Sequence, residues 1–321
     1  HGYYQTQPCM FTHNTDPIFF ALVVDDYGVK YTDRIHFDRL VSCLSQKYHV
    51  KAHPIASSFL GMTIAHDRVA RTITTSMPNY IPNLLARHRP DGCKLYDSPS
   101  IYTPPSYGKS APQLPTTDDS SPASPAQKLE LQQVIGSLLY YARCNDPTIL
   151  EAVTRLASLQ SQPTVNLMQS LDRLIGYVAK HPNNHRTIRP SNMLLQCHSD
   201  ASYLSLPNSG SKAGGYITLG DHNPNFLNSP LHCMSTIIPV VVASAGEAEL
   251  AALFANMQIC IILRTILTNI GYPQPCTPMW CDNEFVKGMC ESSVRPKKSK
   301  SMDVRFNWCR QHVSNGSFSI P

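Results

Sequence analysis

Three acidic residues in the last third of the chain have the arrangement expected of a divalent-cation site. Residues 181–321 contain only eight Asp and Glu residues. Asp200 lies in an expected strand, Glu249 in the first turns of an expected long helix, and Asp282 at the end of another expected strand. Mg²⁺ prefers oxygen ligands, and two such ions roughly 3.5–4 Å apart can hold the attacking and leaving oxygens of a phosphodiester. One acid from each of three elements therefore predicts a metal site for phosphoryl transfer.

Glu247 competes with Glu249 for a place in this site. Ser244 followed three residues later by Glu247 fits the capping-box pattern, in which the glutamate reaches back to the start of the helix. This pattern leaves Glu249 free to face the sheet. For any single acid the simpler interpretation is a helix cap or a solvated element end, whereas the ordered set of three favours a metal site.

A basic run follows the last of these acids in the segment RPKKSK. Its cations are Arg295, Lys297, Lys298 and Lys300. Beside a phosphodiesterase site we interpret them as contacts to nucleic-acid phosphates; a solubilising loop is the alternative. Further cations are spaced through the middle of the chain at Lys128, Arg143, Arg155, Arg173 and Lys180. We interpret these as ordinary outward-facing helix charges that could also follow a duplex.

The elements that must position these residues fall into four segments. The chain has 321 residues, and at roughly 150 residues per domain we expect two or three domains. Residues 96–125 contain seven Pro and seven Ser and predict an extended, exposed linker. Before it, residues 1–95 predict a compact α/β unit whose apolar strand FFALVVDD (19–26) stops at Asp25-Asp26, after which YGVKY (27–31) continues as a second strand. After it, residues 126–190 show helical periodicity, and residues 191–321 predict a mixed-sheet α/β domain.

The composition is typical of a folded intracellular protein. The chain is 42% hydrophobic and carries a net charge of +5, so it can form a sizeable core and tolerate a polyanion. The eleven Cys contain no C-x-x-C pair, which predicts reduced thiols in an intracellular protein, cytoplasmic or nuclear. The longest apolar run, residues 257–267, is interrupted by Arg264, and we expect neither a membrane span nor a secretory leader.

The C-terminal motifs resemble a known family, the copia-type retrotransposon Pol polyproteins, in their RNase H domain. The resemblance lies in SDASY (199–203), ASAGEAELAALF (243–254), CDN (281–283) and KSKSMDVRFNW (298–308). Earlier motifs resemble the reverse transcriptase of the same family, in the order found there. These are FALVVDDYGVKY (20–31), the active-site hairpin of the palm; SFLGMTI to TITTSMPNYI (58–81), the primer-grip region; and IGSLLYYARCNDPT (135–148), the helical stretch between the two activities.

The resemblance implies an α/β (α+β) architecture. Residues 1–95 are identified as a partial palm and primer-grip region, 126–190 as a thumb or connection region, and 191–321 as an RNase H-like domain truncated at its C-terminus. It also implies two phosphoryl-transfer activities with Mg²⁺ or Mn²⁺ as the cofactor. RNA-directed DNA synthesis from dNTPs would use Asp25 as the main ligand with Asp26 supporting it. RNA hydrolysis in an RNA–DNA hybrid, recognised by groove shape and the 2′-hydroxyl, would use Asp200, Glu249 and Asp282.

The chain departs from the family pattern in three places. Val23 stands where reverse transcriptases usually carry an aromatic residue two places before the aspartate pair. The third polymerase carboxylate would lie before His1, and the fourth RNase H carboxylate after the fifth strand of that domain, which the chain reaches only near Pro321. We interpret Asp303 as a helix-surface residue. Both sites are therefore expected to be incomplete, and polymerisation by this chain alone to be absent.

Three functional interpretations follow. The first is a Pol fragment with RNase H and reverse transcriptase chemistry. The second is a non-catalytic retroelement remnant that at most binds nucleic acid. The third, an unrelated metal-dependent hydrolase, explains the acid cluster but not the N-terminal hairpin.

Overall fold

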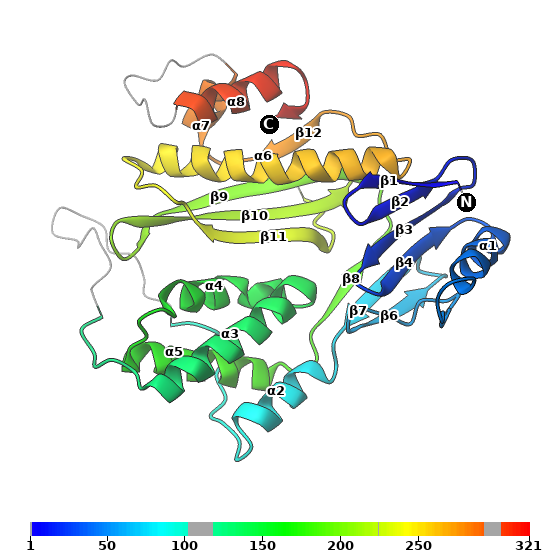
Figure 1. Cartoon of the computed structure of the whole chain (residues 1–321). Coiled ribbons are helices and arrows are strands. Elements are labelled where there is room, and N and C mark those ends of the chain that lie inside the picture. Colours follow the sequence, from blue (N-terminus) through cyan, green and yellow to red (C-terminus); the bar gives the residue numbers. More distant parts are fainter. Residues whose placement is uncertain (1, 102–117, 224, 292–302) are drawn as a thin grey trace.

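The chain folds into three β-sheets and a layer of helices among the residues that the structure describes (Figure 1). The computed structural model describes residues 2–101, 118–223, 225–291 and 303–321. The predicted α+β class is confirmed. The basic run 295–300 and most of the predicted linker lie outside the described residues.

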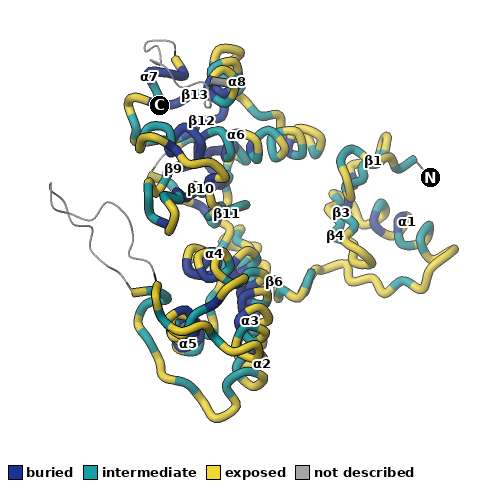
Figure 2. Tube along the Cα trace, turned by 60° about the vertical axis from the view of Figure 1, so that its left-hand side comes forward, coloured by how far each residue is buried: buried dark blue, intermediate teal, exposed yellow. Residues whose placement is uncertain are grey.

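The N-terminal sheet is antiparallel with strand order β1-β2-β3-β4. Its strands are β1 (Tyr3–Gln7), β2 (Met10–His13), β3 (Ile18–Val23) and β4 (Asp26–Tyr31). The β3–β4 hairpin was predicted; β1 and β2 were not, because their alternation is broken by polar residues. Helix α1 (Arg34–Ser45) begins where the Asp33 carboxylate accepts the Ile35 N–H at 3.0 Å. Few residues of this unit are buried, and it projects from the rest of the chain (Figure 2).

A second sheet and the helical layer follow. The sheet consists of β5 (Ser58–Phe59), β6 (Met62–Asp67), β7 (Thr72–Ser76) and β8 (His185–Ile188). The helices are α2 (Tyr80–His88), α3 (Pro125–Cys144), the 3-10 turn η1 (Pro147–Ile149), α4 (Leu150–Leu159) and α5 (Val165–Lys180). Because β8 pairs with β7, the residues just before the C-terminal domain return to the sheet that precedes the helices.

The described ends of the segment 96–125 contact α5. The Tyr96 N–H donates to the Gly176 carbonyl at 3.4 Å, and the Asn166 side-chain amide donates to Asp118 at 3.0 Å. A Cβ at Gly176 would lie 2.0 Å from the Lys94 carbonyl oxygen, so this approach requires glycine. Ser124 then caps α3 with a full capping box.

The C-terminal sheet has the strand order β11-β10-β9-β12-β13. Its strands are β9 (Leu194–Leu206), β10 (Gly210–Gly220), β11 (Pro230–Ile237), β12 (Thr277–Trp280) and β13 (Phe318–Ser319). The first three pair antiparallel, whereas β12 runs parallel to β9 and β13 parallel to β12. The sheet is therefore mixed, as predicted. Strand β11 ends at Ile237, because Pro239 two residues later has no N–H to donate to a ladder.

Helix α6 (Ala245–Asn269) lies along one face of this sheet, on the side away from α3, α4 and α5 (Figure 1). The Asn256 side-chain amide donates to Ser199 Oγ at 2.9 Å and to the Gly214 carbonyl at 2.8 Å, which fixes the helix over β9 and β10. Helices α7 (Glu284–Cys290) and α8 (Asp303–Ser314) complete the domain.

By length and composition alone α6 could cross a membrane, which the interrupted run 257–267 did not predict. Ten of its residues are buried, with most of them packed on the sheet. This is the position of a core helix.

We predict that Gly215→Ala destabilises the chain by about 1–3 kcal/mol. A Cβ at Gly215 would lie 1.9 Å from Asn256 Oδ1 and would displace α6 from the sheet. Gly214→Ala is the matched control on the same strand, because its Cβ would meet only the Asp200 carbonyl at 3.5 Å. Urea unfolding curves of the two variants measure the difference, and equal midpoints would contradict the prediction.

Candidate metal centre

Three separate elements bring Asp200, Glu249 and Asp282 to one end of the C-terminal sheet. Asp200 lies within β9, and Asp282 follows β12. These strands are parallel neighbours in which Trp280 pairs with His198, so the two acids each lie two residues beyond a paired position. Glu249 lies in the second turn of α6, which packs on β9.

The start of α6 separates the roles of the two glutamates. Ser244 Oγ accepts the Glu247 N–H at 3.2 Å, and Glu247 Oε2 accepts the Ala243 N–H at 2.8 Å. Glu247 thus reaches back to the helix start, as predicted, although it accepts the N–H of Ala243, one residue before the N-cap donor of a full capping box. Glu249 is instead buried, with 8% of its surface exposed.

The Glu249 carboxylate lies within interaction distance of both Asp200 and Asp282. The Ala201 N–H donates to Asp200 Oδ1 at 2.8 Å and to Glu249 Oε1 at 3.2 Å, so one donor joins these two acids. Ligand atoms of Glu249, Asp282 and Cys281 lie within 4.8 Å of one another. Cys281 was not predicted as part of the site; its position next to Asp282 was the available signal.

Burial and like charge make Glu249 hard to ionise. Its pKa is raised to about 7, with burial as the largest cause and the charge of the Asp200 carboxylate as the next. The Ala201 N–H lowers this pKa in part, and Asp282 adds to the rise. Glu249 Oε2 is buried and has no hydrogen-bond partner among the described residues. An unpartnered carboxylate oxygen among like charges fits a cation with oxygen ligands.

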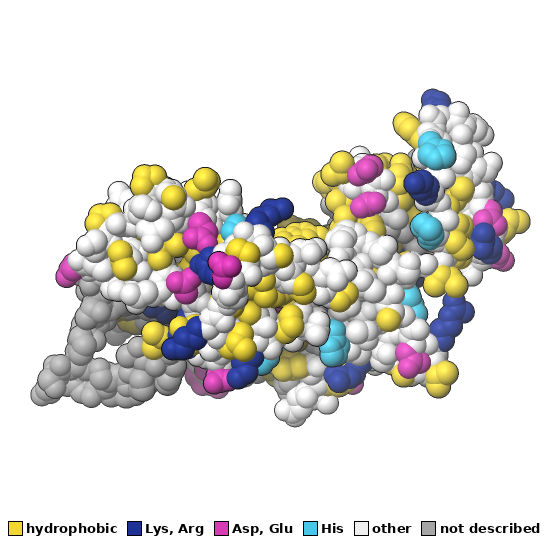
Figure 3. Space-filling view, turned by 90° about the horizontal axis from the view of Figure 1, so that it is seen from below, with side chains coloured by type: hydrophobic (Ala, Val, Ile, Leu, Met, Phe, Trp, Pro, Cys, Tyr) yellow, Lys and Arg dark blue, Asp and Glu magenta, His cyan; other side chains and the backbone are white. Residues whose placement is uncertain are grey.

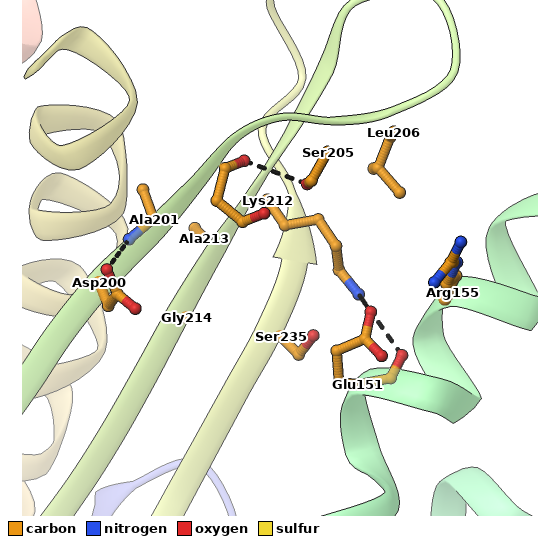
Figure 4. Close-up of a pocket in the computed structure, with 11 residues that line it drawn as sticks. Glu151, Arg155, Asp200, Ala201, Ser205, Leu206, Lys212, Ala213, Gly214 and Ser235 are labelled. Atoms are coloured by element: carbon orange, nitrogen blue, oxygen red, sulfur yellow. Dashed lines mark hydrogen bonds and ion pairs between the residues drawn. The ribbon is translucent and has the colours of Figure 1, made fainter. Parts of the chain in front are cut away.

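Two hollows flank Asp200 and Gly214. One, of about 570 Å³, is lined by residues of β9 and β10, among them His198 and Tyr216, and by the end of β12 together with Cys281 and Asp282, which follow it. The other, of about 200 Å³, extends from Asp200 across β10 to α4 (Figure 4). In it, Lys212 Nζ donates to Glu151 Oε1 at 3.3 Å, and Arg155 lines the α4 side.

The other predicted ligands, Asp25 and Asp26, lie elsewhere. Asp25 is in the β3–β4 turn and Asp26 begins β4, and both are exposed. Their sheet meets the opposite end of α6, where Lys30 Nζ donates to the Tyr272 hydroxyl at 3.1 Å (Figure 1). Within the described part of the chain, these two acids do not join a third potential ligand.

Similar sequences include transposon Pol polyproteins. The chain is 28% identical over 306 residues to the retrovirus-related Pol polyprotein from transposon RE1 of Arabidopsis thaliana, covering 94% of this chain and 19% of that protein. For the Pol polyprotein from transposon TNT 1-94 of Nicotiana tabacum the identity is 23% over 303 residues, covering 94% and 22%. A putative transposon Ty5-1 protein of Saccharomyces cerevisiae is 27% identical over 204 residues, covering 63% and 62%. The resemblance to retrotransposon Pol polyproteins is thereby confirmed. The chain spans about a fifth of the length of the first two relatives.

Solved structures matched by the chain include a foamy viral protease–reverse transcriptase in complex with an RNA/DNA hybrid. Its TM-score is 0.47 at 13% identity, covering 94% of this chain and 35% of that one. The N-terminal RNase H domain of a Mycobacterium tuberculosis protein has a TM-score of 0.29 at 14% identity, covering 40% and 79%. No protein-family model matches the chain.

We predict that Glu249→Gln stabilises the metal-free chain above pH 7 by about 1–3 kcal/mol. A carboxyl whose pKa rises from 4.5 unfolded to about 7 folded lowers stability as pH rises through this window, and the loss is complete above it. An amide does not titrate, so the stability of the variant should change less between pH 5 and 8.

Thermal unfolding in a chelating buffer across that pH range checks this difference. Asp221→Asn, at an exposed acid after β10, serves as the control and should follow the wild type. Parallel pH profiles for wild type and Glu249→Gln would contradict the prediction.

Proposed function

We propose that the C-terminal domain is an RNase H-type phosphodiesterase that hydrolyses the RNA strand of an RNA–DNA hybrid. The observation that carries the proposal is the convergence of Asp200, Glu249 and Asp282 from three elements. These residues would hold Mg²⁺ or Mn²⁺. Bound there, the cations would supply activation of water and neutralisation of charge on the phosphodiester. The homology to Pol polyproteins supports the same assignment.

The three carboxylates differ in how the fold holds them and in how exposed they are. Glu249 is fixed by the cap of α6 and by Asn256, and its burial keeps one carboxylate oxygen out of water. Asp200 and Asp282 are exposed at the same end of the sheet, where a phosphodiester can approach. The Ala201 N–H holds the Asp200 and Glu249 carboxylates together.

The nucleic-acid backbone would follow the hollow between Asp200 and α4. Arg155 lines it, and this exposed cation lies near Lys212 (Figure 4). Three of the other middle-region cations are engaged within the fold: Lys128 Nζ donates to the Ser161 carbonyl, Arg173 to Ser98 Oγ, and Lys180 to Asp97. On the helical side, basic and acidic side chains are intermixed (Figure 3). Phosphate contacts by 295–300 stay a prediction.

A non-catalytic remnant that binds nucleic acid is the alternative function, and an intracellular location is part of both proposals. All eleven cysteines lie in the described residues and are free thiols, which supports that location.

We predict that Asp200→Asn lowers kcat/KM for hybrid cleavage roughly 100-fold or more, because several kcal/mol of metal-dependent stabilisation is lost. The assay follows a labelled RNA strand paired to DNA in Mg²⁺. Glu247→Gln is the matched control on α6 and should cleave at a rate close to that of the wild type. A wild-type chain that binds the hybrid without cutting it would favour the alternative function.

For Arg155→Ala we predict weaker hybrid binding with a salt dependence reduced by about one unit in the log–log slope, since one phosphate contact is lost. Arg87→Ala removes an exposed cation from α2 and should leave the slope unchanged. Fluorescence anisotropy at several salt concentrations measures both slopes. Identical slopes for the two variants would exclude Arg155 from the binding surface.

RNA-directed DNA synthesis is the second activity that the family resemblance implies, with the exposed Asp25 and Asp26 at the β3–β4 hairpin as its metal ligands. We predict no primer extension on an RNA template by this chain, because no third ligand joins the pair among the described residues. Gel analysis of an extended primer tests this, and template-dependent extension by the purified chain would contradict it.

A further inference from the structure

The thiol of Cys281 belongs to the same cluster as two of the carboxylates. Its sulfur and the nearest oxygens of Glu249 and Asp282 all lie within 4.8 Å of one another. Cys281 is half-buried, is not in a disulfide, and lines the hollow that contains Asp200 and Asp282.

The side chains of Cys281 and Asp282 can both approach Glu249 because strand β12 ends before them. Within a strand, successive side chains would point to opposite faces. Strand β12 ends at Trp280, however, and the Asn283 side chain accepts the N–H groups of Phe285 and Val286 at 3.1 and 3.2 Å to begin α7. The two intervening residues lie in the turn between strand and helix, where the alternation does not apply.

One sulfur and two carboxylate oxygens form a ligand set for a borderline-soft cation. Zn²⁺ binds Cys sulfur at roughly 2.3 Å and carboxylate oxygen at roughly 2.0–2.2 Å, with water often completing a tetrahedron. Around such an ion the ligand atoms would lie roughly 3.3–3.6 Å apart, so side-chain rotation of modest size closes the observed cluster. Mg²⁺, by contrast, uses oxygen ligands.

A second observation indicates a ligand at this position. Glu249 is more than nine-tenths buried, and its Oε2 has no hydrogen-bond partner among the described residues. This oxygen belongs to the carboxylate that approaches Cys281 and Asp282. A buried carboxylate oxygen without a donor is costly unless a cation or proton occupies the site.

We propose that Glu249, Cys281 and Asp282 bind a thiophilic divalent cation of the Zn²⁺ class, which competes with Mg²⁺ for the two carboxylates. Binding forms a metal–sulfur bond and releases the thiol proton to solvent. The inference rests on the proposed function only in that both sites share Glu249 and Asp282. Zn²⁺ would therefore act as an inhibitor of the proposed phosphodiesterase.

Co²⁺ is the probe that tests this site. Added to the reduced, metal-free full chain, Co²⁺ should give the near-ultraviolet charge-transfer band of a cobalt–thiolate bond, and Zn²⁺ should displace it. Cys281→Ser should abolish the band and weaken Zn²⁺ binding roughly tenfold or more. Cys276→Ser, at an exposed cysteine just before β12, is the matched control and should retain the band.

A measurement on the wild type covers the case in which Cys281→Ser does not fold. Stoichiometric Zn²⁺ should protect Cys281 from alkylation, as mapped by mass spectrometry, while Cys276 stays reactive. A band that persists in a folded Cys281→Ser chain, or alkylation of Cys281 unaffected by Zn²⁺, would overturn the proposal. Neither readout uses hybrid cleavage. Hybrid cleavage in Mg²⁺ without a cobalt–thiolate band would support the proposed function and contradict the Zn²⁺ site. A cobalt–thiolate band without hybrid cleavage would support the Zn²⁺ site and contradict the proposed function.

Discussion

Mutual repulsion between the carboxylates of Asp200, Glu249 and Asp282 is the constraint on which the C-terminal domain depends. Burial and the neighbouring charge of Asp200 raise the pKa of Glu249 to about 7, so folding brings together groups that would separate in water. A single backbone N–H, from Ala201, is shared between two of them. A bound cation would remove this cost, whereas the metal-free chain retains it.

The packing of α6 holds the cluster together. Asn256 fixes the helix to β9 and β10, and the cap at Ser244 sets where its first turn begins. On the other face of the sheet, Lys212 Nζ donates to Thr154 Oγ1 at 3.0 Å and attaches α4 to β10. The helical layer thus forms one wall of the hollow beside Asp200, and a nucleic acid bound there would contact both parts of the chain (Figure 4).

Local patterns predicted much of this arrangement. The Ser244–Glu247 spacing distinguished the capping glutamate from Glu249, and the apolar run before Asp25 predicted the β3–β4 hairpin. Strand pairing between distant segments could not be predicted from local patterns. Strand β8 pairs with β7 across more than a hundred residues, and no local pattern specifies that partner. Cys281 was missed because strand alternation places it on the face opposite Asp282, and only the end of β12 at Trp280 brings both to one site.

The most direct test of the central claim is to locate Mn²⁺ in crystals of the chain by its anomalous scattering. The account predicts anomalous density between the carboxylates of Asp200, Glu249 and Asp282, and loss of that density in crystals of Asp200→Asn. Density at other sites only, or none despite millimolar Mn²⁺, would show that the three acids do not form a metal centre.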